Sequence, residues 1–177
     1  VLTLQIENDR AALTDRHYTQ GARLSWLSGK KKLPAWTGKL GNLLLWGPLF
    51  QFGQGAPDKT VQRLGVALGQ SIFTPEDVRR RDVVLGDRPY AGWLYLGLSV
   101  HSEHRDSNGE PVRLDTVELN LGIVGPAAFA GAVQNNFHDL INSVRSEGWD
   151  NQLSNEPGVV FAAERRWRTL VFPRPVG

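Results

Sequence analysis

The sequence predicts an all-β protein whose strands form one antiparallel, up-and-down sheet. Apolar and polar residues alternate along six segments, which is the period of a strand with two different faces. Four of these segments run for eleven or more residues, whereas strands of soluble sandwiches usually have about 5 to 6. The predicted strands are residues 1–9, 18–26, 61–72, 90–100, 114–124 and, with a weaker pattern, about 158–169.

Composition narrows the class of protein. The chain has 177 residues, enough for one domain, and a net charge of only +2, too small for a nucleic-acid-binding surface. The lack of Cys excludes disulfides, thiolate metal sites and a Cys nucleophile. The densest apolar run, residues 43–46, is far shorter than the about 18 residues of a membrane helix, but alternating strands are compatible with a membrane β-barrel. Because the chain also lacks Met, Val1 is interpreted as the start left after removal of a signal peptide.

The first two segments each have one apolar face. Leu2, Leu4 and Ile6 share a face of the first segment. On the apolar face of the second segment, Tyr18 and Trp26 are separated by about 26 Å, at about 3.3 Å per residue. This separation is close to the height of the apolar band of a membrane barrel, so the two rings are candidates for its two aromatic girdles.

The later segments repeat the alternation. Their apolar positions include Leu64, Val66, Leu68, Leu94, Leu96, Leu98, Val100, Val117, Leu119, Leu121 and Ile123. The opposite face carries Gly, Ala, Ser, Arg, Glu and Asn, which fits the interior of a barrel and equally the solvated face of a soluble sandwich. The connection over residues 29–60 is long for a turn and is predicted to pack as a small plug or foot. Residues 172–177 are predicted to form an unstructured tail.

One segment follows a helical period instead. After Pro126, a good first residue for a helix, residues 127–145 are predicted to form one amphipathic helix. Its apolar positions are Phe129, Val133, Phe137, Leu140, Ile141 and Val144. On the polar side, His138 lies four residues from both Gln134 and Asn142. Taken alone, that position is typical of an ordinary surface histidine.

The predicted strand order brings distant polar residues to one rim of the sheet. If the strands run up and down in sequence order, the end of the first, the start of the second, the end of the third and the start of the helix meet there. The residues placed at this rim are Asn8, Asp9, Thr19, Arg79, Arg80, Arg81, Tyr90 and His138. An amide, a carboxylate, a hydroxyl, an imidazole and guanidinium groups beside an apolar wall form a candidate active site.

These groups suit hydrolysis of an ester or an amide. His138 can take a proton from water near neutral pH. Asp9, with Asn8 beside it, can hold a hard cation such as Ca²⁺, whose charge stabilises an oxyanion. Neighbours on a regular strand face opposite sides, so Asn8 and Asp9 share one site only if the strand ends or bulges there. The arginines match the geometry of phosphate groups.

Several short motifs occur in order along nearly the whole chain. They are Asn8-Asp9, Asp15-Arg16, residues 18–21, 69–75, 86–92 and 121–126, Gln134-Asn135 with His138, and Gly148-Trp149 with Gln152. In this combination the chain resembles the lipid A 3'-O-deacylase family of Gram-negative outer membranes.

The resemblance implies a twelve-stranded barrel in the outer membrane and a carboxylic ester hydrolase that depends on Ca²⁺. The implied reaction removes the 3'-linked acyloxyacyl group of lipid A, at the outer-leaflet rim between the barrel wall and a helix. Lipid A or lipopolysaccharide is the implied partner, and no nucleic acid or protein partner is implied. The family's catalytic residues fall on Asn8, Asp9, Thr19 and His138, with Asn8 and Asp9 as metal ligands. A family lysine has no clear counterpart, and the run Arg79–Arg81 is the expected phosphate-binding replacement.

Six strands are too few to close a membrane barrel, whose smallest members have about eight. An open edge in lipid also leaves backbone groups unsatisfied. Residues 1–177 are therefore interpreted as a single domain that forms the N-terminal part of such a barrel. Two other functions fit the sequence. One is a barrel that binds lipopolysaccharide without cleaving it, and the other is a soluble antiparallel β module that binds a ligand at its rim.

Overall fold

The computed structural model describes residues 1–8, 20–29, 60–83 and 85–168, with Asn8 described by its backbone alone. Four features predicted from the sequence lie outside these residues. They are Asp9, Tyr18, Thr19 and almost all of the connection 29–60. The predicted tail, residues 172–177, also lies outside them.

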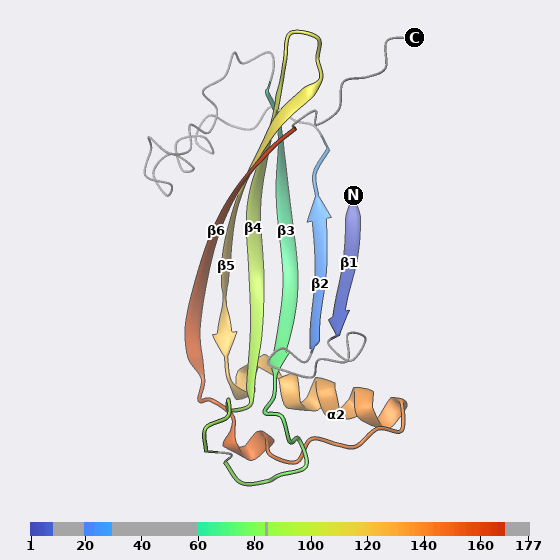
Figure 1. Ribbon diagram of the computed structural model, residues 1–177, viewed down its shortest axis with the longest axis vertical. Helices are drawn as coiled ribbons and strands as arrows, with labels where there is room; N and C mark the ends of the chain where they lie inside the picture. Colours follow the sequence, from blue (N-terminus) through green and yellow to red (C-terminus); the bar gives the residue numbers. More distant parts are fainter. Residues whose placement is uncertain (9–19, 30–59, 84, 169–177) are drawn as a thin grey trace.

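The described residues form one sheet in which six antiparallel strands follow each other in sequence order (Figure 1). The strands are β1 (Leu2–Asn8), β2 (Gln20–Leu27), β3 (Thr60–Phe73), β4 (Ala91–Arg105), β5 (Pro111–Val124) and β6 (Glu156–Trp167). Among the described residues, β1 and β6 each pair on one side only. The predicted all-β, up-and-down architecture is confirmed.

Two of the strands are longer than their hydrophobic pattern. The apolar alternation of β4 stops at Val100, yet the strand continues to Arg105 because Ser102 still pairs with Asp115 of β5. Backbone pairing does not depend on the polarity of the side chains, so a strand can continue where its apolar pattern ends. β6 likewise begins at Glu156, before the first residue of the predicted segment.

The two faces of the sheet differ in polarity, and the apolar face is the exposed one, unlike in a soluble protein. The apolar face is exposed, with large exposed side chains at Leu24, Trp26, Leu68, Leu96, Leu98, Leu121 and Phe161. On the other face, Arg23 of β2 donates to both carboxylate oxygens of Glu118 of β5, at 2.7 and 2.9 Å. Gly69 leaves room there, since a Cβ at this position would come within 2.3 Å of the Tyr95 ring. The sheet therefore turns a polar, ion-paired face inward and an apolar face outward.

The helical segment is shorter than predicted and is divided in two. A 3₁₀ turn, Pro126–Ala128, precedes α2 (Ala130–Leu140), and a second 3₁₀ turn follows at Trp149–Asn151. Phe129, with φ 56°, separates the first turn from α2, and Asn142, with φ 51°, lies just past its end. Left-handed residues interrupt helical hydrogen bonding, which is why the predicted helix 127–145 shrinks at both ends. Within the described part of the chain, no helix combines the length and apolarity needed to span a membrane.

Candidate active site at one end of the sheet

The backbone register aligns one residue from each of four strands at the same end of the sheet. Asn8 of β1 pairs with Gln20 of β2, and Gln20 pairs with Ile72 of β3. Ile72 pairs in turn with Gly92 of β4, whose carbonyl oxygen accepts a hydrogen bond from the backbone N–H of Gly125 at 3.0 Å. The end of β1 thus lies in one row with the segment that leads into α2.

α2 starts on the outer side of this end. Gly92 fits tightly beneath it, since a Cβ there would lie 2.4 Å from the Cβ of Ala130. Gln70 donates through Nε2 to the carbonyl oxygen of Ala128 at 2.6 Å. Gln70 is two residues from the exposed Leu68, so the two share a face of β3. The helix is therefore attached to the apolar, outward face of the wall, and in Figure 1 it lies crosswise at the lower end of the strands.

His138 is buried, with 9% of its surface exposed, so the expectation of an ordinary surface histidine is wrong. It shares the buried stripe of α2 with Ala130 and Gln134. Its Nδ1 lies 2.5 Å from the carbonyl oxygen of Val144. A carbonyl can only accept, so Nδ1 carries the proton and Nε2 is left as the acceptor of a neutral imidazole. No described residue forms a hydrogen bond with that Nε2.

A buried aromatic clamp fixes the orientation of α2. Trp149 donates through Nε1 to Oε1 of Gln134, at 3.0 Å. The same indole packs on the Tyr90 ring, with ring centroids 4.8 Å apart. The Tyr90 hydroxyl donates to the carbonyl oxygen of Val78 at 3.0 Å, and burial raises the pKa of Tyr90 above its ordinary value. The clamp joins α2 to the loop between β3 and β4.

A second contact holds the segment after α2. Asn135 accepts from the backbone N–H of Ser146 at 2.9 Å and donates to its carbonyl oxygen at 3.2 Å. The sequence motifs include Gln134, Asn135 and Trp149, but sequence reasoning missed that Gln134 bonds to Trp149 and that Asn135 bonds to Ser146. The only sign of these contacts in the sequence was that the residues occur together in the ordered motifs. These residues position His138.

The three arginines lie on the loop between β3 and β4, and two of them are paired. Arg80 binds Asp82, and this hydrogen bond holds the pKa of the Asp82 carboxyl below its ordinary value. Arg81 binds Glu147 at 2.5 Å, which ties the loop to the segment after α2 and raises the pKa of Arg81. Among the described residues, none forms an ion pair or hydrogen bond with the side chain of Arg79.

A hollow of about 520 Å³ opens next to the end of β1. Its lining is mostly polar and comprises Gln5, Glu7, Gly21, Ala22, Arg23, Gln70, Ser71 and Tyr95. Glu7 pairs across the sheet with Gly21, one residue before the row that contains Asn8. The described part of this hollow holds no group of three His, Asp or Glu side chains that would by itself bind a metal ion. The predicted roles of the Asn8 side chain, Asp9 and Thr19 remain predictions, because they lie outside the described structure.

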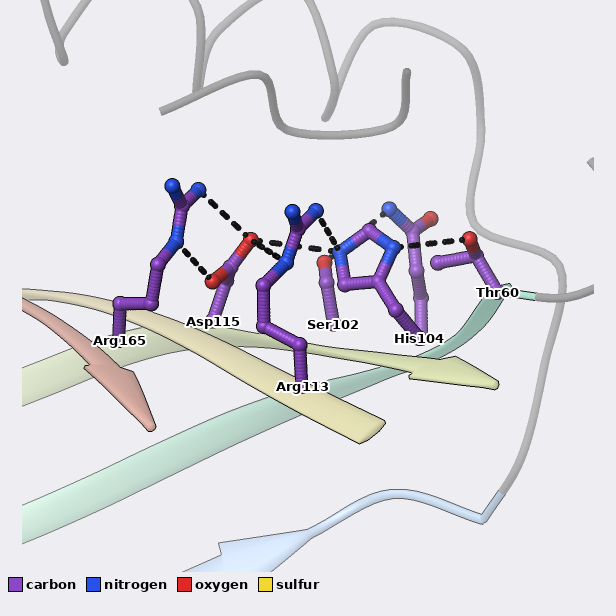
Figure 2. A network of polar contacts seen from close by, with 7 residues as sticks. Thr60, Ser102, His104, Arg113, Asp115 and Arg165 are labelled. Atoms are coloured by element: carbon purple, nitrogen blue, oxygen red, sulfur yellow. Dashed lines mark hydrogen bonds and ion pairs between the residues drawn. The ribbon is translucent and has the colours of Figure 1, made fainter. Parts of the chain in front are cut away.

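A different polar cluster occupies the opposite end of the same outward face (Figure 2). Asp115, with a side chain that is 0% exposed, accepts from Arg165 at 2.7 and 3.1 Å and lies 3.3 Å from Nε of Arg113. His104 is within 3.0 Å of Nη2 of Arg113 and 3.3 Å of the hydroxyl of Thr60. Nε2 of His104 also lies 3.3 Å from Oδ2 of Asp115, so this nitrogen faces both a guanidinium and a carboxylate, while Nδ1 faces Thr60.

This cluster contains Ser102, His104 and Asp115 without forming a catalytic triad. A triad needs a serine hydroxyl bonded to the histidine that is to take its proton. Here the Ser102 hydroxyl is fully buried and accepts from Gln62 at 3.4 Å, while Thr60 and Arg113 engage the two nitrogens of His104. No hydrogen bond between Ser102 and His104 is found in this described region. The cluster is structural.

Comparison with known proteins gives a family match and a fold match. Residues 1–176 match the model of the family described as outer membrane protein LpxR. Among solved structures, LpxR from Salmonella typhimurium is similar at a TM-score of 0.64 and 21% sequence identity, over 93% of this chain and 50% of that chain. At that identity the likeness establishes the fold alone, and the chain spans about half the length of the Salmonella protein. No curated protein sequence matches the chain.

Proposed function

The chain belongs to the LpxR family of outer membrane proteins, and from this premise we propose that it hydrolyses the ester of the 3'-linked acyloxyacyl group of lipid A. Its location in the outer membrane rules out the soluble binding module. The observation that carries the proposal is the geometry of His138. It lies on the buried side of α2, its Nδ1 is held by a carbonyl oxygen, and its Nε2 is left as a proton acceptor.

In the proposed reaction, Nε2 of His138 takes a proton from a water molecule as the water oxygen attacks the ester carbonyl carbon. The carbonyl oxygen becomes the oxyanion of a tetrahedral intermediate. When the intermediate collapses, the bond to the sugar oxygen breaks, and His138 returns its proton to that oxygen. The Val144 carbonyl favours the Nδ1–H tautomer throughout and accepts a stronger hydrogen bond when the ring is charged.

Calcium is part of the proposal. Asn8 and Asp9 supply amide and carboxylate oxygens, the donor types that Ca²⁺ takes, at the end of β1. When bound there, the ion would supply positive charge to the oxyanion. Thr19 is proposed as a neighbouring polar group at the same oxyanion.

We assign the substrate phosphate contact to Arg79. Arg80 and Arg81 already have carboxylate partners, whereas the Arg79 side chain has none among the described residues. An unpaired guanidinium can bind phosphate without first breaking an ion pair. Arg79→Gln is therefore expected to raise KM for lipid A about tenfold, since charge-assisted hydrogen bonds contribute about 1.5–3 kcal/mol. Arg80→Gln is the matched control and is expected to change KM much less. Equal effects of the two substitutions would contradict the assignment.

Mass spectrometry of lipid A tests the proposed reaction. The protein is refolded in detergent and incubated with purified lipid A, with Ca²⁺ or with a chelator, alongside His138→Ala. The expected result is a Ca²⁺-dependent loss of one acyloxyacyl group that disappears in the variant, with kcat lower by at least about 10². His101→Gln, on the inward face, is the control, and circular dichroism checks that each variant is folded.

Each component of the proposal has a result that would exclude it. Binding of lipid A by folded protein without any loss of acyl mass would favour the non-cleaving barrel. Activity that survives in His138→Ala would exclude the histidine as the base. Activity that is the same with chelator would exclude Ca²⁺, and unchanged Ca²⁺ dependence in Asp9→Asn would exclude Asp9 as its ligand.

A further inference from the structure

The amphipathic helix α2 buries its polar stripe and exposes its apolar one. The buried stripe is Ala130, Gln134 and His138. The exposed large apolar side chains on and beside α2 are Phe129, Val133, Phe137, Leu140 and Ile141, and they range from 36% to 79% exposed. A helix of a soluble protein shows the reverse arrangement. The exposed stripe therefore needs an apolar environment other than the protein's own core.

The exposed side chains form one continuous arc. At about 100° per residue, the three that lie within α2, Val133, Phe137 and Leu140, cover an arc of about 60° that borders the buried stripe. Asn136 and Asp139 lie next to this arc, on the side away from the buried stripe, and both are exposed. α2 therefore has three faces: one against the wall, one apolar and one polar.

The apolar arc continues the lipid-facing surface of the wall. In an outer membrane protein with alternating strands, the exposed apolar face of the sheet is turned to lipid. α2 is attached to that same face, through Gly92 against Ala130 and Gln70 bonded to Ala128. Near its far end, Leu140 is 79% exposed. The arc is thus joined to an established membrane surface and is not an isolated patch.

We propose that α2 lies in the membrane interface and inserts its apolar arc among the acyl chains of the surrounding lipids. Helices of this kind bury their apolar face about 5–10 Å into the boundary between headgroups and acyl chains, and keep a polar face in water. Asn136 and Asp139 supply that polar face. The proposal concerns the placement of α2 and does not depend on hydrolysis of any lipid.

Depth-dependent quenching tests this placement. The chain contains no Cys, so a single introduced thiol within it is unambiguous. Leu140→Cys and the adjacent Asp139→Cys are labelled with an environment-sensitive fluorophore. The protein is then reconstituted into phosphatidylcholine vesicles with or without bromine on the acyl chains. The label at 140 is expected to be quenched at least about twofold more than the label at 139, because an interfacial helix puts only its apolar face below the headgroups.

A second pair repeats the comparison in the middle of the helix. Val133→Cys and Asn136→Cys should show the same difference in quenching, and the emission at 133 should be shifted to the blue. All four positions are exposed, so labelling is compatible with the fold. Equal quenching within both pairs would overturn the proposal. It would also be overturned if the label at 140 were shielded only after lipid A is added, or only through a cross-link to a second copy of the protein.

Discussion

The two ends of the sheet hold polar clusters of opposite kinds. At the end opposite α2, the buried carboxylate of Asp115 is bound by Arg165 and lies next to Arg113. At the α2 end, hydrogen-bonding capacity is left over: Nε2 of His138 has no described partner, and Nε2 of Gln134 is buried without a hydrogen bond. A cluster whose charged groups are paired within the protein stabilises a fold, whereas an acceptor without a partner in the protein is available to a substrate. The difference explains why a set containing Ser, His and Asp at one end is structural, and a lone histidine at the other end is the candidate base.

The largest effect is expected when the ion-paired cluster around Asp115 is broken. Asp115→Asn leaves Arg113 and Arg165 without their buried counter-ion, and removal of one partner of a buried pair costs about 3–5 kcal/mol. Urea unfolding of the vesicle-inserted protein, followed by tryptophan fluorescence, measures the loss. Glu164→Gln makes the same chemical change in the exposed pair with Arg166 and is expected to cost less than about 1 kcal/mol.

The rate of lipid A deacylation by Asp115→Asn also tests the comparison between the two ends of the sheet. Folded Asp115→Asn should deacylate lipid A at the rate of the unmodified protein, because its cluster lies at the far end of the strands. A large loss of kcat in fully folded protein would contradict the division into a structural end and a catalytic end.

An effect of intermediate size on stability and on kcat is expected when the aromatic clamp loses its hydrogen bond. Trp149→Phe keeps a ring against Tyr90 but removes the donor to Gln134, which leaves a buried polar group unpaired at a cost of about 1–3 kcal/mol. Because the clamp orients α2, kcat should fall with little change in KM. Trp167→Phe, at an exposed position of β6, is the control for the loss of an indole. Unchanged kcat in Trp149→Phe would show that the clamp does not position His138.

The smallest effect is a pH dependence at the exposed pair of Arg80 and Asp82. The hydrogen bond from Arg80 lowers the pKa of Asp82 in the folded protein. The contribution of a group with a lowered pKa is present above its ordinary pKa and is lost as the pH falls through the lowered value. Thermal unfolding should therefore separate the unmodified protein slightly from Asp82→Asn at pH 7, and the two should converge in acid. A difference that grows in acid would contradict this sign.

Much of the sheet was predictable because successive side chains of a strand point to opposite faces, so the difference between the faces appears as an alternation in the sequence. The alternation around Leu68 and Leu96 predicted the strands and which residues share a face, and the assumption of an up-and-down sheet supplied their order. The row of strand ends followed from that order, and so did the position of His138 near it. The extension of β4 past Val100 was not predictable from hydrophobicity, since Ser102 and His104 end the apolar pattern while the backbone pairing continues.

The sequence by itself determined which residues share a face, and only the tertiary structure decided what each face meets. Periodicity predicted an amphipathic helix around His138, but it could not tell that the polar stripe would be buried and that Phe129 and Leu140 would be exposed. The spacing of Gln134 and Trp149 likewise did not reveal their hydrogen bond. The physical reason is that the environment of a face depends on distant segments and on the surrounding solvent. A membrane reverses the rule by which an apolar stripe is expected to turn toward the protein.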